Sequence, residues 1–203
     1  SHWVRQEEAF TLEQAIRIAK TYRSLEREAM ATSNLASLNL AGNRLEAALK
    51  GNARALALNQ HLGYAYGHYL EHGNRGEILI AMGRLSEAKP HLQTAISSES
   101  IGLAVWAFRG LLAWIDGQAE GRGPAMATLA NSVEMLRAPA PREAAKLFVK
   151  LGRLQLMEGD RSSAEATLRE ATAWAGRLHA ALGSDLRAAC SQLRAELQLA
   201  PEQ

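Results

Sequence analysis

Glycine recurs in this sequence where helices are predicted to end, and this recurrence limits the possible folds more than any other feature. Four such turns lie 41, 34 and 42 residues apart, at Gly42, Gly83, Gly117 and Gly159. Glycine suits the end of a helix because the left-handed backbone conformation costs it little. In three of these segments an alanine follows five residues later, at Ala47, Ala88 and Ala164. We therefore predict a helical repeat of about forty residues.

A second set of glycines lies seven residues before the last three turns, inside otherwise helical runs, at Gly76, Gly110 and Gly152. A glycine inside a helix costs about 1 kcal/mol relative to alanine, so three of them in register require a packing reason. We predict that the second helix of each pair crosses the first helix at these glycines. A side chain there would push the two helices apart.

The amino-acid composition predicts an all-α protein. Alanine, leucine, arginine and glutamate dominate, and all four are strong helix formers. Valine occurs only four times, and no segment shows the alternation of apolar and polar residues that a half-buried strand requires. The five prolines lie at or near the predicted helix boundaries, where a helix tolerates them.

Charge and cysteine content restrict the partners and the compartment. A net charge of +2 gives no support for direct binding to nucleic acid or to an anionic membrane. No run of 18 apolar residues is present, so we predict no membrane span. With Cys190 as the only cysteine, we expect a buried, inert thiol and a cytoplasmic location. The initial Ser-His is consistent with a cloning remnant on a fragment of a larger protein.

Two segments carry the repeat pattern most fully. Residues 145–176 contain Phe148, Leu151, Gly152, Ala164, Leu168 and Ala171, and residues 69–100 contain Gly76, Leu79, Ala88, Leu92 and Ala95. These positions resemble the tetratricopeptide repeat (TPR), in a longer form of about forty residues that is similar to the repeats of bacterial regulators and signalling proteins. The resemblance implies a right-handed superhelical solenoid of antiparallel helix pairs, each stabilised by its neighbours. The sequence departs from the family pattern at His72, which replaces an aromatic residue, and in 103–137, which carries an inserted turn.

The repeat pattern divides the chain into helical segments within a single predicted domain over residues 1–203. The predicted segments are an N-terminal helix over 11–27, a divergent repeat over 28–60, clearer repeats over 64–100, 102–137 and 142–178, and a C-terminal closing helix over 184–199.

The family resemblance also implies a binding site, because the first helix of each repeat lines a concave groove. The residues at those stations are Asn74 and Glu77, then the apolar Phe108, Leu111 and Trp114, then the basic Lys146, Lys150 and Arg153. An apolar middle beside a basic end is the layout expected of a peptide-binding groove. The alternative is a solvated basic face beside an aromatic side chain that covers a helix joint.

The run His68-Tyr-Leu-Glu71-His72 matches the H-x-x-E-H motif of the inverted zincins. On a helix the two histidines would share a face, as two zinc ligands require, and Glu71 could act as a base. A third, acidic ligand is expected about 75 residues downstream, but Leu147, Phe148 and Val149 occupy that region. We therefore predict no catalytic residue, no metal site and no cofactor.

The leading functional hypothesis is a non-enzymatic scaffold that binds a protein or peptide ligand in the concave groove. One alternative is a sensor or regulatory domain of a bacterial transcriptional or signalling protein. A zinc-dependent hydrolase using the HYLEH run and a self-assembling array are further alternatives, and a homo-oligomer is compatible with the sequence. The identity of the partner cannot be predicted from these residues.

Overall fold

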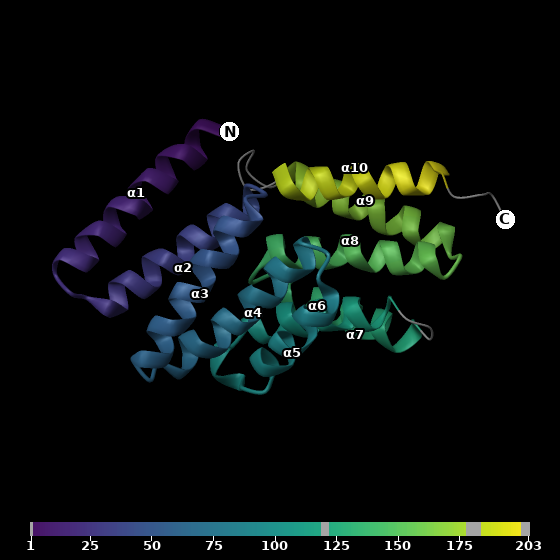
Figure 1. The fold of residues 1–203 in the computed structure, drawn as a ribbon. Helices are drawn as coiled ribbons and strands as arrows, with labels where there is room; N and C mark the ends of the chain where they lie inside the picture. The colour runs from purple at the N-terminus through teal and green to yellow at the C-terminus, as the bar shows by residue number, and fades with distance from the viewer. Residues whose placement is uncertain (1, 119–121, 178–183, 200–203) are drawn as a thin grey trace. The chain divides into compact units, whose positions relative to one another are not determined.

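The computed structural model describes residues 2–118, 122–177 and 184–199. In these ranges the chain forms ten α-helices, one short 3-10 helix and no strand, which confirms the predicted all-α class (Figure 1). The elements are α1 (His2–Thr21), α2 (Leu25–Ala41), α3 (Leu45–His61), α4 (Ala65–Ala81), α5 (Leu85–Ile96), η1 (Glu99–Ile101), α6 (Ala104–Asp116), α7 (Gly123–Leu136), α8 (Pro141–Met157), α9 (Arg161–Arg177) and α10 (Ser184–Leu199).

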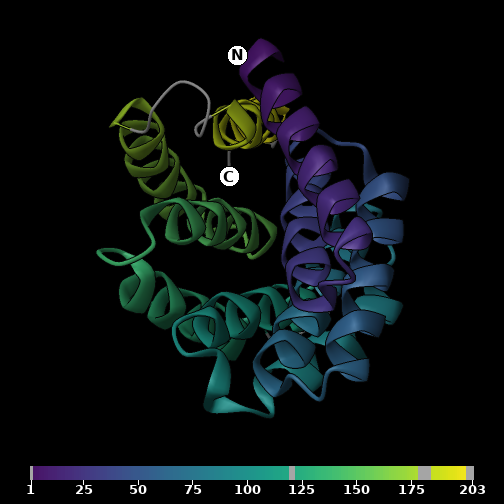
Figure 2. The same ribbon diagram turned by 90° about the vertical axis from the view of Figure 1, so that its left-hand side faces the viewer.

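Contacts divide the chain into two compact units, residues 1–108 and 109–203, and the boundary falls within α6. In the first unit, α1 to α5 pack in chain order, each against its predecessor, as the purple-to-blue helices of Figure 2 show. In the second unit, α7 to α10 pack in the same sequential way, and α10 also contacts α8. The sequence predicts one array over residues 1–203, whereas the contacts form these two units, and each is described by itself below.

The four turns that join α1 to α5 repeat every twenty residues. Each contains one residue with a positive φ angle, and these residues are Arg23, Asn43, Gly63 and Gly83. The residue after each of them donates its backbone N–H to the carbonyl oxygen five residues earlier, with N–O distances of 2.8 to 3.0 Å. This is the Schellman arrangement, which satisfies the free carbonyl groups at the end of a helix. Two helices and two turns therefore span forty residues, as the glycine spacing predicts.

The turn between α2 and α3 corrects the predicted register by one residue. Gly42 has a φ of −89°, and Asn43 takes the left-handed conformation instead, with a φ of 56°. Asparagine tolerates this conformation better than most residues because its short polar side chain bonds locally. The small residue that packs after this turn is accordingly Ala48, which is fully buried, and not Ala47, which is exposed.

Glycines inside the helices receive side chains from neighbouring helices. A Cβ atom at Gly76 would lie 2.6 Å from Leu92 of α5, the second helix of the pair, as predicted. One at Gly152 would lie 3.0 Å from Thr167 of α9, the predicted helix, but also 2.9 Å from Leu193 of α10. The prediction is wrong at Gly110. A Cβ atom there would lie 2.5 Å from Leu147 of α8, which is the first helix of the next pair.

At Gly117 the helix ends as predicted, since α6 stops at Asp116, but this glycine is not among the residues with a positive φ angle. This glycine is buried, and a Cβ atom on it would lie 2.5 Å from Leu154 of α8. Gly110 in α6 and Gly117 just after its end thus both face α8 and leave room for side chains of that helix. Leu147 and Leu154 of α8 occupy the space that the two missing side chains leave.

Predicted and observed helix boundaries differ most at the N-terminus. The predicted helix over 11–27 runs through the turn at residues 22–24, so its last residues belong to α2, and α1 itself begins at His2. The three clearer repeats agree within four residues with the helix pairs α4–α5, α6–α7 and α8–α9. The closing helix α10 has the predicted span. No helix in the described ranges is long and apolar enough to cross a membrane.

Candidate functional site

In the second unit, Trp114 on α6 and Lys150 on α8 form the most distinctive surface contact. The Lys150 Nζ atom lies 5.3 Å from the centroid of the Trp114 ring, and both side chains are half-buried. A cation within about 6 Å of an aromatic face is attracted by the negative charge of that face. The close approach of α6 and α8 at Gly110 and Gly117 places the two residues side by side.

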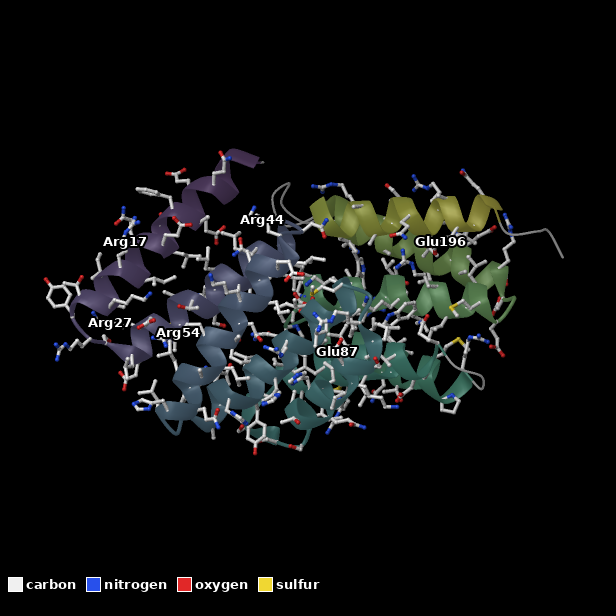
Figure 3. The ribbon with its side chains drawn as sticks, in the orientation of Figure 1. Arg17, Arg27, Arg44, Arg54, Glu87 and Glu196 are labelled. Carbon is white, nitrogen blue, oxygen red and sulfur yellow. The ribbon has the colours of Figure 1, made fainter. Side chains whose placement is uncertain are left out.

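The other two predicted basic residues are already neutralised within the second unit. Lys146 Nζ lies 3.1 Å from an oxygen of Glu143 one turn earlier on α8, and Arg153 Nη2 lies 3.1 Å from an oxygen of Glu196 on α10. Glu196 is labelled on α10 in Figure 3. Two of the three residues of the predicted basic end thus have carboxylate partners within the second unit.

Phe108 and Leu111 belong to the core and not to an exposed groove. Their side chains are 4% and 5% exposed. The Phe108 ring lies over Gly73 of α4, where a Cβ atom would approach the ring to 2.1 Å. Of the predicted apolar middle, only Trp114 keeps surface that a ligand could contact.

Asn74 and Glu77 lie on α4 in the first unit, and both are half-buried. The predicted groove residues are thus divided between the two units, since Phe108 belongs to the first unit and the residues from Leu111 onward belong to the second. Asn74 forms a side-chain hydrogen bond with the carboxyl group of Glu71, so it is part of a polar cluster within the first unit.

Glu71 is the centre of this polar cluster and is only 2% exposed. Ser33 Oγ donates a hydrogen bond to one carboxyl oxygen, and Asn52 Nδ2 donates to the other at 2.7 Å and to the Glu71 backbone oxygen at 2.9 Å. Burial raises the pKa of the Glu71 carboxyl, and the hydrogen bonds from Ser33, Asn52 and Asn74 offset part of this effect.

Sequence reasoning found Glu71 through its motif but missed Ser33 and Asn52. The sequence contains one signal for Asn52, because it lies four residues after Ala48 and three before Ala55, on the buried face of α3. A polar residue on a buried face requires a hydrogen-bond partner. No comparable signal marks Ser33, because its partner is 38 residues away on another helix.

Three imidazoles lie beside this cluster, on α4 and α5. His72 Nδ1 and His91 Nδ1 are 2.8 Å apart, so the N–H of one ring donates a hydrogen bond to the other ring. The rings of His68 and His72 meet edge to face with centroids 4.7 Å apart. Burial, followed by the charges of His68, His91 and Arg75, lowers the pKa of His72 to about 4. Burial also lowers the pKa of His91, with a further contribution from the charge of Arg75.

The HYLEH residues do not converge on one point. Glu71 accepts hydrogen bonds from α2 and α3, whereas His72 is bonded to His91 of α5. Within the part of the chain that the structure describes, no group of three or more His, Cys, Asp or Glu side chains is arranged to hold a metal ion. Glu71 and His72 form hydrogen bonds to other helices, and the ring contacts of His68 are with Tyr69 and His72 of its own helix.

Cys190 is a buried free thiol on α10, as the sequence predicts. Burial raises the pKa of the Cys190 thiol above its ordinary value. The thiolate, which is the reactive form, is therefore disfavoured at this position.

These features define the class of protein as an all-helical chain in which successive helices pack in order, with an aromatic–cation contact on one unit and a buried polar cluster in the other. No family model matches the sequence, and no curated protein matches it. Its function is therefore inferred from the side chains themselves.

Proposed function

We propose that this chain is a non-enzymatic, TPR-like module that binds a protein or peptide segment through the face around Trp114. The observation that supports this most is the half-buried Trp114 with a lysine ammonium 5.3 Å from its ring centroid. Tryptophan is among the residues most enriched at binding hot spots, because it offers a large contact area with few rotatable bonds. A cytoplasmic location is part of the proposal, since a chain with one cysteine suits a reducing compartment.

The same face indicates which ligand chemistry it would accept. Met157 lies seven residues after Lys150 on α8 and is 44% exposed, so it extends the apolar surface along the helix. The Lys150 ammonium lies 5.3 Å from the centroid of the Trp114 ring, so a ligand that covers this ring also comes close to a positive charge. We expect an apolar side chain to cover Trp114 and a single carboxylate to approach Lys150.

A peptide selection tests this proposal. Peptides that bind the wild-type protein would be selected from a random library, and their dissociation constants measured by calorimetry for wild type and for Trp114→Ala. The matched control is Met135→Ala, which removes a side chain of 42% exposure from α7 in the same unit. We expect Trp114→Ala to weaken the selected peptides and Met135→Ala to leave them unchanged. Equal affinity for all three proteins would contradict the proposed face.

A further inference from the structure

Arg75 on α4 makes few of the hydrogen bonds that its guanidinium group could donate. Its Nη1 atom contacts the Asn52 side-chain oxygen at the long distance of 3.5 Å. Its Nε atom is buried and has no hydrogen-bond partner among the described residues. An N–H group buried without an acceptor is costly, so this guanidinium gains when an acceptor is supplied.

Two other arginines of the first unit show how the same part of the side chain is normally satisfied. Arg54 donates from Nε and Nη2 to one oxygen of Glu28 at 2.9 and 2.8 Å. Arg84 donates from the same two atoms to Glu87, at 2.7 Å each. The edge formed by Nε and Nη2 matches the two oxygens of a carboxylate or phosphate group.

No carboxylate of the described residues is ion-paired with Arg75 in this way. Glu87 is close enough to interact electrostatically, but it is bound by Arg84, and the Glu71 carboxyl faces Ser33 and Asn52. The titratable groups that interact electrostatically around Arg75 are His68 and His72 on α4, and His91 and Glu87 on α5. The α3 helix contributes Asn52, which is uncharged. Arg75 therefore lies among imidazoles that become positive when they bind a proton.

We propose that Arg75, together with His72 and His91, forms a site for an external oxyanion, a carboxylate or phosphate group. The Arg75 side chain turns outward from its long contact with Asn52 and presents its Nε–Nη2 edge to the anion. The His72–His91 pair supplies additional N–H donors and, on protonation, additional positive charge. This site lies wholly within the first unit and is independent of the face around Trp114.

Anion binding at this position is coupled to protonation of the two histidines. A negative charge beside His72 and His91 favours their protonated forms, so the bound state takes up protons. By reciprocity, lowering the pH strengthens anion binding. A nonspecific surface interaction would instead show no saturation.

The test is an NMR titration of the histidine ring resonances of the wild-type protein, with ionic strength held constant by chloride. Sulfate represents a phosphate-like anion of constant charge, and acetate represents a carboxylate; each is titrated at pH 6.0 and pH 7.5. We expect saturable shifts of the His72 and His91 resonances with at least one of the two anions, and tighter binding at pH 6.0. The more strongly bound anion identifies the ligand class. No saturable shift with either anion would overturn the proposal without reference to any variant.

Three variants assign the effect to Arg75. Arg75→Gln should weaken binding by about tenfold or more, because it removes a charge-assisted pair of hydrogen bonds. Arg75→Lys keeps the charge but not the two-pronged edge, and should bind with intermediate affinity. Arg27→Gln removes the same charge from an exposed position on α2, well away from Glu87 in Figure 3, and should bind as wild type does. Unchanged binding by folded Arg75→Gln would overturn the assignment.

Discussion

Ser33 on α2 donates a hydrogen bond to the carboxyl group of Glu71 on α4, 38 residues further along the chain. The α2 helix begins at Leu25 and α4 begins forty residues later, at Ala65. Ser33 therefore occupies the position in α2 that Gly73 occupies in α4. Gly73 receives the ring of Phe108 from α6. The junction of α2 with α4 is thus polar where the next junction is apolar.

The first prediction concerns the charge of Glu71. Glu71→Gln should keep the hydrogen bonds, since the amide can accept from Asn52 and donate to Ser33, and it removes the cost of burying a charge. We expect its free energy of unfolding at pH 7, measured in urea, to equal or exceed that of wild type. Glu71→Ala should lose about 2–4 kcal/mol, because it leaves a cavity and an unsatisfied Asn52. An equal loss in both variants would show that the charge itself is required.

The pH dependence of stability provides the second prediction. The pKa of His72 is about 4 in the folded chain and about 6.5 when the chain is unfolded, so the unfolded state binds the proton first as the pH falls. The contribution of His72 is complete above pH 6.5 and is lost as the pH falls toward 4. Since the ring is only half-buried, solvent screening limits the loss to about 1–2 kcal/mol.

Glu71 acts in the opposite direction and must be separated from this effect. Its pKa is raised in the folded state, so the stability it confers falls as the pH rises above 4.5. The measurement is therefore the difference between wild type and His72→Gln in the free energy of unfolding at pH 7 and pH 5. We expect the variant to lose less stability than wild type on acidification. An equal loss of unfolding free energy in the two proteins would show that His72 is not responsible for the pH dependence.

The third prediction tests the corrected register of α3. Ala48 has no exposed surface, so Ala48→Leu should overpack the α2–α3 contact and cost about 1–3 kcal/mol. Ala47 is exposed, and Ala47→Leu should change stability by less than about 0.5 kcal/mol. Thermal unfolding of the two variants would decide between the registers. If Ala47→Leu were the more destabilising variant, the predicted register that begins at Gly42 would be correct.

The sequence predicts the helical class and the forty-residue period well because both depend on local signals. Left-handed turn residues and small buried residues recur at fixed spacing, and Gly83 with Ala88 and Gly159 with Ala164 follow that pattern in the structure. The prediction fails at Gly42 because asparagine can replace glycine in a left-handed turn. Two adjacent residues, Gly42 and Asn43, could each take that role, and the sequence alone does not choose between them.

The binding site is harder to predict from the sequence than the fold, because it depends on contacts between distant segments of the chain. A family pattern places Phe108 on the inner face of a first helix, but whether its ring is exposed depends on the absence of a side chain at Gly73, 35 residues earlier. Likewise, the charge of Arg153 is neutralised by Glu196 on another helix. Local periodicity identifies the face of a helix, and tertiary packing decides what covers it.

The fourth prediction compares two glycines of the second unit. Gly110→Ala would place a Cβ atom 2.5 Å from Leu147, so α6 and α8 must separate or Leu147 must move, and we expect a loss of about 1–3 kcal/mol. Gly176 lies in α9, where an added methyl group would meet no atom within 4 Å, so Gly176→Ala should gain up to about 1 kcal/mol from helix propensity. Chemical denaturation of both variants measures this, and destabilisation by both would argue against the close approach of α6 and α8.

The last prediction separates the roles of Trp114 and Lys150 in the proposed binding of a peptide. Trp114→Ala should weaken binding by about 2 kcal/mol or more, chiefly through faster dissociation, because a buried aromatic anchor holds the complex together. Lys150→Glu should instead slow the association of an acidic peptide and reduce its dependence on salt, because a partly exposed charge mainly steers the encounter. Arg153 is left unchanged, since its ion pair with Glu196 would be lost. Surface plasmon resonance at two salt concentrations measures both rates. If both folded variants retain wild-type rates, the peptide binds elsewhere on the chain.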